Sequence, residues 1–170
     1  MKRLHILFSI TILLSLYSFS SFSQSAPLPN KIAFNDASDY KKYEKDFVAS
    51  FNWLEGQPLN STRSDIKSVD AFLLQWMVGT PDVSISVNGY ATDMAKKNPD
   101  MLIYYMGGWS RYVIEHPEEK DSIKFHLAAV EEVLKIYKGM NGVKKDKKID
   151  KLVLLQTEGK LEEYIKSQIK

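Results

Sequence analysis

The chain has 170 residues, with 23 Lys and Arg against 21 Asp and Glu, and its formal net charge is +2 at pH 7. Lys2 and Arg3 account for this excess, so the rest of the chain is formally neutral and gives no electrostatic argument for nucleic-acid binding. The sequence contains no cysteine. This excludes disulfides, thiolate zinc sites, a cysteine nucleophile and lipid attachment at a cysteine.

Residues 1–23 have the pattern of a cleaved signal peptide. Two basic residues precede an apolar run over residues 4–16, and Ser21 and Ser23 occupy the small-residue positions of a cleavage site. The run is too short to span a bilayer well and has no stop-transfer flank. We therefore predict cleavage before Gln24 and an exported protein, either periplasmic or secreted.

Residues 24–35 contain two prolines and are expected to form a flexible N-terminal segment, followed by one helical domain over 36–170. The first helix is predicted to begin at Asp36 or Ser38, either of which can cap it, and to end before Gly56. Apolar residues recur in it at helical spacing. They are Tyr40, Tyr43, Phe47, Phe51 and Leu54.

The second predicted helix opens at residues 60–62, where Thr62 fits a capping box with Asp65, and Gly79 and Pro81 stop it. Its buried stripe is formed by Ile66, Val69, Leu73 and Trp76. Residues 83–87 then alternate between apolar and polar side chains, as in a strand. Because a lone strand has no partner for its backbone hydrogen bonds, we expect a short extended or hairpin-like segment near 82–89.

A short helix is predicted over residues 90–98, and Asn98 followed by Pro99 has the pattern of a helix cap with proline at the first helical position. The helix that follows is apolar on nearly every side, which is typical of the buried centre of a domain. The remaining predicted helices cover 99–116, 117–139, 149–156 and 160–169. We therefore predict an all-α, single compact domain of five to seven packed helices.

Two adjacent glycines, Gly107 and Gly108, lie inside the apolar helix, where each costs about 1 kcal/mol relative to alanine. Glycine at such positions indicates the close approach of another backbone or a large ring, or, as a sharper alternative, of a ligand. Trp53 lies beside its helix's apolar stripe next to a turn, which favours a rim or partner contact. The predicted ligand or partner surface therefore comprises Trp53, Gly107, Gly108 and Trp109.

No catalytic, metal or cofactor site is predicted from the sequence. His116 and His126 would lie ~15 Å apart along one helix and could not share a metal ion there, and their spacing suggests no third ligand. Neighbouring acids on a helix point about 100° apart, so they do not converge on one substrate atom. A hydrolase would need a carboxylate pair assembled from different helices, such as Glu55 with Glu115.

The function predicted from these features is an exported, non-catalytic binding or interaction module of the cell envelope or secreted space. Its partner is an unknown protein or envelope component, with no nucleic acid and no membrane span. One alternative is a small envelope-acting hydrolase, and another is a helical-repeat-like fragment that docks to a larger envelope assembly. The run Lys144–Lys148 is interpreted as a solvated loop, with contact to an acidic partner or anionic lipid as its functional alternative.

Overall fold

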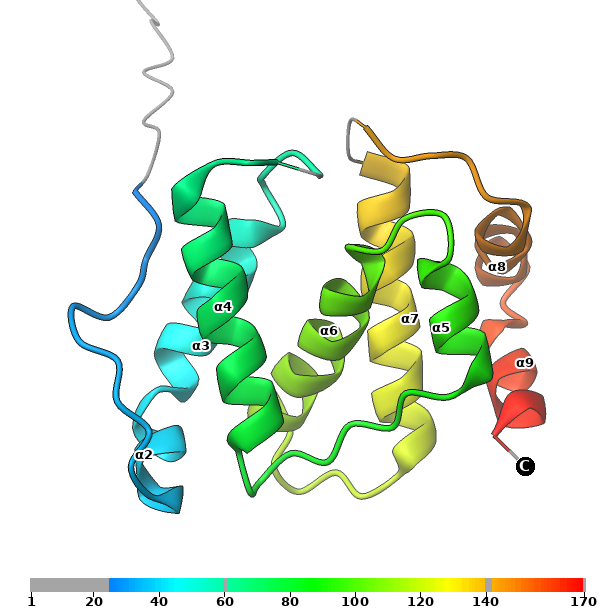
Figure 1. The fold of residues 1–170 in the computed structure, drawn as a ribbon. Helices are drawn as coiled ribbons and strands as arrows, with labels where there is room; N and C mark the ends of the chain where they lie inside the picture. The colour runs from blue at the N-terminus through cyan, green and yellow to red at the C-terminus, as the bar shows by residue number, and fades with distance from the viewer. Residues whose placement is uncertain (1–24, 60, 140–141, 170) are drawn as a thin grey trace, which may run out of the picture.

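The structure, a computed structural model, describes residues 25–59, 61–139 and 142–169. Over these ranges the chain is all-α, with eight helices and no strand (Figure 1). The helices are α2 (Ala37–Lys42), α3 (Glu44–Leu54), α4 (Ser64–Gly79), α5 (Gly89–Ala95), α6 (Met101–Glu115), α7 (Ser122–Gly139), α8 (Lys147–Thr157) and α9 (Leu161–Gln168). The predicted all-α class is confirmed, whereas the predicted number of five to seven helices is too low. The predicted signal peptide lies outside the described residues.

The additional helix arises because the segment predicted as one helix is divided at Tyr43. This residue has φ −93° and ψ 5°, so it ends α2 and precedes α3. Its hydroxyl donates a hydrogen bond to the Lys31 carbonyl at 3.0 Å. Asp36 caps α2 as predicted, in a capping box with Asp39. The division therefore places the Tyr43 side chain against the segment that precedes α2.

Residues 25–35 contain no helix and lie along the outer side of the helices that follow (Figure 1). Besides the Tyr43 contact, side-chain contacts with α2 and α3 attach this segment to the domain. Ser50 donates a hydrogen bond to the Pro27 carbonyl at 2.9 Å, and the Phe34 ring stacks on Tyr40 with centroids 4.5 Å apart. The segment thus covers part of the aromatic core beside α3.

Three predicted helix starts are wrong, each because a side chain has another role. Helix α4 begins at Ser64 without a side-chain cap, since the Asp65 carboxylate pairs with Arg63 rather than forming a box with Thr62. Helix α6 begins at Met101, because the buried Asn98 side chain bonds to the backbone of Lys144. Helix α7 begins at Ser122.

The delayed start of α7 follows from a turn between the two central helices. The Glu119 carboxylate accepts hydrogen bonds from the backbone N–H groups of Lys120 and Asp121, both at 2.8 Å. The Asp121 carboxylate in turn accepts from the N–H of Ile123 at 2.9 Å. These acids therefore organise the turn and the first residues of α7 rather than a helix that starts at Pro117.

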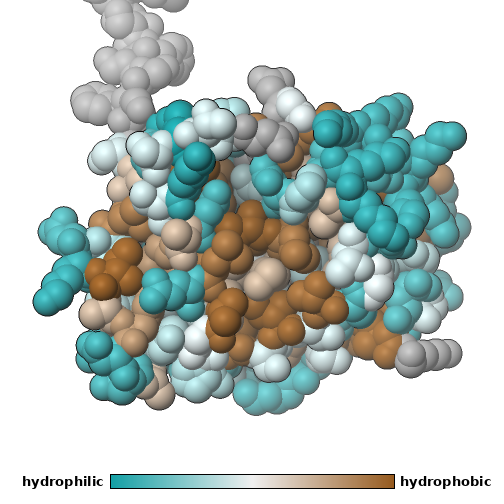
Figure 2. All heavy atoms as spheres, viewed as in Figure 1, coloured by the Kyte–Doolittle hydropathy of each residue, from teal (hydrophilic) through white to brown (hydrophobic). Residues whose placement is uncertain are grey.

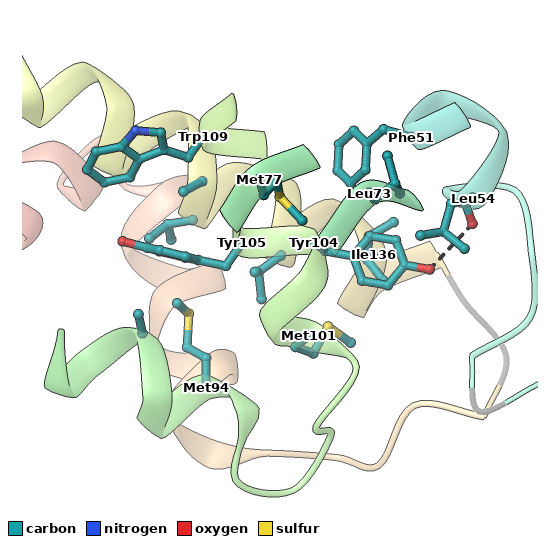
Figure 3. Close-up of a cluster of buried hydrophobic side chains, with 14 of the residues drawn as sticks. Phe51, Leu54, Leu73, Met77, Met94, Met101, Tyr104, Tyr105, Trp109 and Ile136 are labelled. Atoms are coloured by element: carbon teal, nitrogen blue, oxygen red, sulfur yellow. Dashed lines mark hydrogen bonds between the residues drawn. The ribbon is translucent and has the colours of Figure 1, made fainter. Parts of the chain in front are cut away.

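Helix α6 lies at the centre of the domain, in contact with α3, α4, α5 and α7 (Figure 1). Its side chains project into a core that includes Phe51, Leu73 and Met77 from α3 and α4 (Figure 3). This position confirms the interpretation of its nearly continuous apolar surface. Residues 80–88 form an extended connector between α4 and α5. Across the described residues, no helix combines the length and hydrophobicity that crossing a bilayer requires.

Candidate functional site

The glycines of α6 are contact points with two neighbouring helices. A Cβ atom on Gly107 would collide with the Phe51 ring of α3, and one on Gly108 would lie 2.7 Å from the Cβ atom of Glu132 on α7. Both glycines are buried. The close approach expected at this pair is therefore made by protein side chains, on α3 for Gly107 and on α7 for Gly108.

The two predicted tryptophans occupy different environments. Trp53 is partly buried on α3 and packs against the core. Trp109 is 3% exposed, and its Nε1–H has no hydrogen-bond acceptor among the described residues. Trp109 also lines a cleft of about 560 Å³ together with Val113, Ile114 and Phe125. Of the predicted site residues, Trp109 thus lies beside this cleft, and Gly108 lines a smaller hollow between α6 and α7.

Another hollow, of about 280 Å³, lies between α4 and α6. Helix α4 contributes Ile66, Asp70 and Leu74, which are four residues apart and therefore share one face. Three apolar residues of α6 form the opposite wall, and the loop after α3 closes one end. The residues of this wall and loop are Leu102, Ile103, Met106, Pro58 and Leu59. We call this hollow the α4–α6 groove.

The groove lies on an apolar face of the molecule. Figure 2 shows hydrophobic residues gathered where α6 lies between α4 and α5 in the same view. Leu74 lies on the groove wall with 42% of its surface exposed, and Val78, one turn further along α4, is 79% exposed. Helix α4 therefore leaves aliphatic side chains in contact with solvent next to a hollow that is large enough to receive an aliphatic group.

Asp70 is the distinctive polar residue of this groove. It is half-buried between aliphatic neighbours and has no hydrogen bond or ion pair with the described residues. Burial, followed by the negative charge of Asp100, raises the pKa of the Asp70 carboxyl from 3.8 to about 6. At neutral pH the groove therefore contains an ionised carboxylate that no cation from the described part of the chain neutralises.

Tyr104 adds a hydroxyl to the groove, near Asp70. The hydroxyl donates a hydrogen bond to the Leu54 carbonyl at 3.4 Å, and Figure 3 shows this contact between α6 and the end of α3. Burial raises the pKa of Tyr104, and the charges of Asp70 and Asp100 raise it further. The site therefore combines aliphatic walls, two nearby carboxyls and a neutral phenol, an arrangement suited to an ammonium group that carries an aliphatic chain.

Outside the groove, a cluster of charged side chains lies where the end of α3 meets α6 and α7. Arg111 forms ion pairs with Glu55 and Glu132, and its guanidinium also lies 5.0 Å from the centroid of the Phe51 ring. Lys135 pairs with Glu55 at 2.6 Å. The second oxygen of Glu132 lies 3.5 Å from the Lys135 Nζ without forming a hydrogen bond. Glu55 thus meets Glu132, not Glu115, and two cations accompany the pair.

The two glutamates of this cluster have opposite pKa shifts. Burial and the charge of Glu55 raise the pKa of Glu132, whose side chain is 4% exposed. Burial also acts to raise the pKa of Glu55, but hydrogen bonding to Lys135 and the charge of Arg111 outweigh it and lower that pKa. The cluster contains two cations and two acids, and its ion pairs join α6 to α7 and to the end of α3.

His126 belongs to a buried polar group. It is 2% exposed, and its Nδ1 lies 2.8 Å from the hydroxyls of both Tyr90 and Tyr105. Burial lowers the pKa of His126, which favours the neutral ring. His116, by contrast, lies at the end of α6. No three His, Asp or Glu residues in the described ranges are placed to hold a metal ion.

The sequence analysis missed Asp70, although a signal for it was present. Its position midway between Ile66 and Leu74 places a carboxyl on an otherwise aliphatic helix face, and such a residue needs a partner or a ligand. No family model, curated protein or solved structure matches the chain.

Proposed function

We propose that the protein is a non-catalytic binding module whose α4–α6 groove receives an aliphatic amine, either as a free amphiphile or as the side chains of a polypeptide. The observation that carries the proposal is the half-buried carboxylate of Asp70, which lies among aliphatic walls with no cation from the described residues beside it. An ammonium group would neutralise this charge, and the attached chain would cover the apolar wall.

The dimensions of the groove favour a small ligand group. Its volume of about 280 Å³ is near the lower end of the range for small-molecule sites, roughly 300–1,000 Å³. Each CH₂ group removed from water contributes about 0.8 kcal/mol, so the chain supplies most of the affinity. The carboxylate supplies selectivity, because an amine gains an ion pair there and a carboxylic acid of equal length meets repulsion.

The pairing of Glu55 and Glu132 with cations favours this binding function over the alternative of a hydrolase. Arg111 and Lys135 already hold these carboxylates. A general acid and base must instead reach the substrate with a free oxygen or proton. Asp70 has no cation partner among the described residues, and it lies in a groove whose walls are aliphatic.

Calorimetric titration with octylamine, octanol and octanoate at neutral pH tests the proposal. The expected order of affinity is octylamine, then octanol, then octanoate. The substitution Asp70→Asn should remove the preference for the amine while leaving octanol binding unchanged. Equal affinities of the native protein for all three compounds, or an unchanged preference in the variant, would contradict the role of Asp70.

We also infer that this binding takes place outside the cytoplasm, since residues 1–23 have the pattern of a cleaved leader. The intact mass of the protein recovered from its native compartment tests this inference. A mature chain that begins at Gln24 is expected. A functional protein that retains residues 1–23 would contradict export with cleavage.

A further inference from the structure

Two lysine-rich segments that are far apart in the sequence lie side by side in the structure. Residues 96–97 follow α5, whereas residues 144–146 lead into α8 and residues 147–148 begin it. The Lys97 Nζ donates a hydrogen bond to the Lys145 carbonyl at 3.3 Å. Next to it, the Asn98 amide donates to the Lys144 carbonyl at 2.8 Å, and its oxygen accepts from the Lys144 N–H at 2.7 Å.

These contacts combine two basic segments into one surface with six exposed lysines. We call it the lysine surface, and it consists of Lys96, Lys97, Lys144, Lys145, Lys147 and Lys148. The interpretation of 144–148 as a loop is wrong for Lys147 and Lys148, which belong to α8. The side chains of Lys97 and Asn98 form hydrogen bonds with the backbone of this run, and the second segment brings further positive charge.

Acidic residues neutralise only part of the lysine surface. Asp93 forms ion pairs with both Lys96 and Lys148. Asp146 is buried and accepts a hydrogen bond from the backbone N–H of Lys148 as the cap of α8. The other four lysines have no carboxylate partner among the described residues. These four are Lys97, Lys144, Lys145 and Lys147.

We propose that the lysine surface docks the protein on an anionic phospholipid bilayer. Lysine is a compact, hydrated point charge on a flexible stem, and it suits a diffuse array of phosphates better than one shaped site. Protein interfaces are instead enriched in arginine, whereas every basic residue in the two segments of this surface is lysine. Juxtamembrane lysines are attracted by anionic lipids through their summed charge.

The lysine surface lies next to one end of the α4–α6 groove, which supports docking on a lipid bilayer. Pro99 and Asp100, which line the groove, directly follow Lys97 and Asn98 in the chain. In Figure 2 a hydrophilic area lies beside the apolar face, where Figure 1 places the segment that leads into α8. Docking through the lysines would therefore bring this end of the groove close to the lipid headgroups.

Vesicle co-sedimentation of the protein at low salt tests the proposal. We expect binding to vesicles of phosphatidylcholine mixed with phosphatidylglycerol, and little binding to pure phosphatidylcholine. The triple substitution K144E/K145E/K147E should weaken binding to the anionic vesicles by at least about tenfold. Added salt should weaken the binding of the native protein as well, because it screens exposed charges.

A charge-matched control separates local docking from net charge. Lys31, Lys45 and Lys67 are exposed and have no ion pair among the described residues. The variant K31E/K45E/K67E therefore changes the net charge equally but leaves the lysine surface intact. It should keep most of the vesicle binding. Circular dichroism of both variants confirms that each is folded.

Three results would overturn the proposal. The first is an absence of native binding to anionic vesicles at low salt, and the second is an equal loss of binding in the two triple variants. The third is binding to polyglutamate but not to vesicles, which would assign the surface to an acidic protein partner. The Asp70→Asn variant retains all six lysines, so it should bind the anionic vesicles like the native protein. Vesicle binding and amine binding can therefore fail separately.

Discussion

Two buried or partly buried carboxyls, Glu132 and Asp70, show how differently this fold treats acidic side chains. Glu132 of α7 faces α6 and pairs with Arg111, which also pairs with Glu55 at the end of α3. Asp70 lies in the α4–α6 groove, and no cation of the described chain reaches it. Desolvation raises the pKa of both groups. The fold therefore compensates one carboxyl internally and leaves the other to be compensated from outside.

The difference separates a structural role from a binding role. A partly compensated charge between packed helices contributes to the positions of those helices, and removing its partner leaves an expensive buried charge. An uncompensated carboxyl at a half-open groove instead lowers stability in the free protein, and a cationic ligand would relieve that cost. Four substitutions test this difference, and the largest expected change in stability comes first.

The substitution Arg111→Met should produce the largest effect. It leaves Glu55 and Glu132 close together without their bridging cation, which should destabilise the protein by about 3 kcal/mol. Urea unfolding at neutral pH measures this change. Adding Glu132→Gln to the variant should recover part of the loss, because it removes one of the two stranded charges. A cost below about 1 kcal/mol would indicate that the cluster is solvated and not structural.

The substitution Gly108→Leu should rank second. A Cβ atom there would lie 2.7 Å from the Cβ of Glu132 and 3.2 Å from the Ala128 carbonyl oxygen, so α6 and α7 must separate. We expect a destabilisation of about 1–3 kcal/mol in a thermal melt. Gly139→Leu at the end of α7 is the control, because no atom lies within 4 Å of its added Cβ. A Gly108→Leu melting temperature at or above that of the native protein would refute the packing role.

The substitution Asp70→Asn should act in the opposite direction. The pKa of Asp70 is about 6 in the folded protein, against 3.8 for an ordinary aspartate in the unfolded chain. Between these pH values the folded state therefore binds more protons than the unfolded state. Native stability therefore falls as pH rises from about 4 to about 6. Since the carboxyl is half-exposed, we expect the variant to be more stable by only about 1 kcal/mol at neutral pH, with no gain below pH ~4.

Paired melts at neutral pH and at pH ~4 test this sign. A neutral-pH loss of stability in Asp70→Asn would mean that the carboxylate has a compensating partner in the native protein. Such a result would remove the distinction between Asp70 and Glu132. Together with the octylamine titration, the melts separate the stability cost of Asp70 from its role in binding.

The sequence allowed most helices to be placed, because apolar residues at helical spacing require a buried stripe. It did not reveal the division at Tyr43, where the periodic pattern continues unchanged through the break. It also assigned Asn98 to a helix cap, whereas its amide bonds to a segment 46 residues away. Local patterns locate most helices, but tertiary contacts decide which partner a polar side chain takes and therefore where some helices begin.

The same limit applies to the candidate site. Gly107 and Gly108 were recognisable as points of close approach, but their neighbours Phe51 and Glu132 come from other helices. The meeting of Glu55 with Glu132 required the packing of α3 beside α6 and α7. Asp70 was accessible in principle, because its place on an aliphatic helix face is a property of spacing within one helix.

The substitution Glu162→Gln should have the smallest effect. Glu162 is paired but exposed, so it shows what an ion pair contributes without burial. Glu162 pairs with Lys124 on α7 and with Lys166 on its own helix, and both contacts are exposed to solvent. Hydrogen bonding to Lys166, then to Lys124, lowers the pKa of Glu162, so any stability that it contributes is lost as pH falls through that lowered pKa. Because exposed ion pairs are screened by water, the melting temperature at neutral pH should be unchanged within error. A decrease as large as that of Arg111→Met would show that pairing, and not burial, sets the cost of removing a charge in this protein.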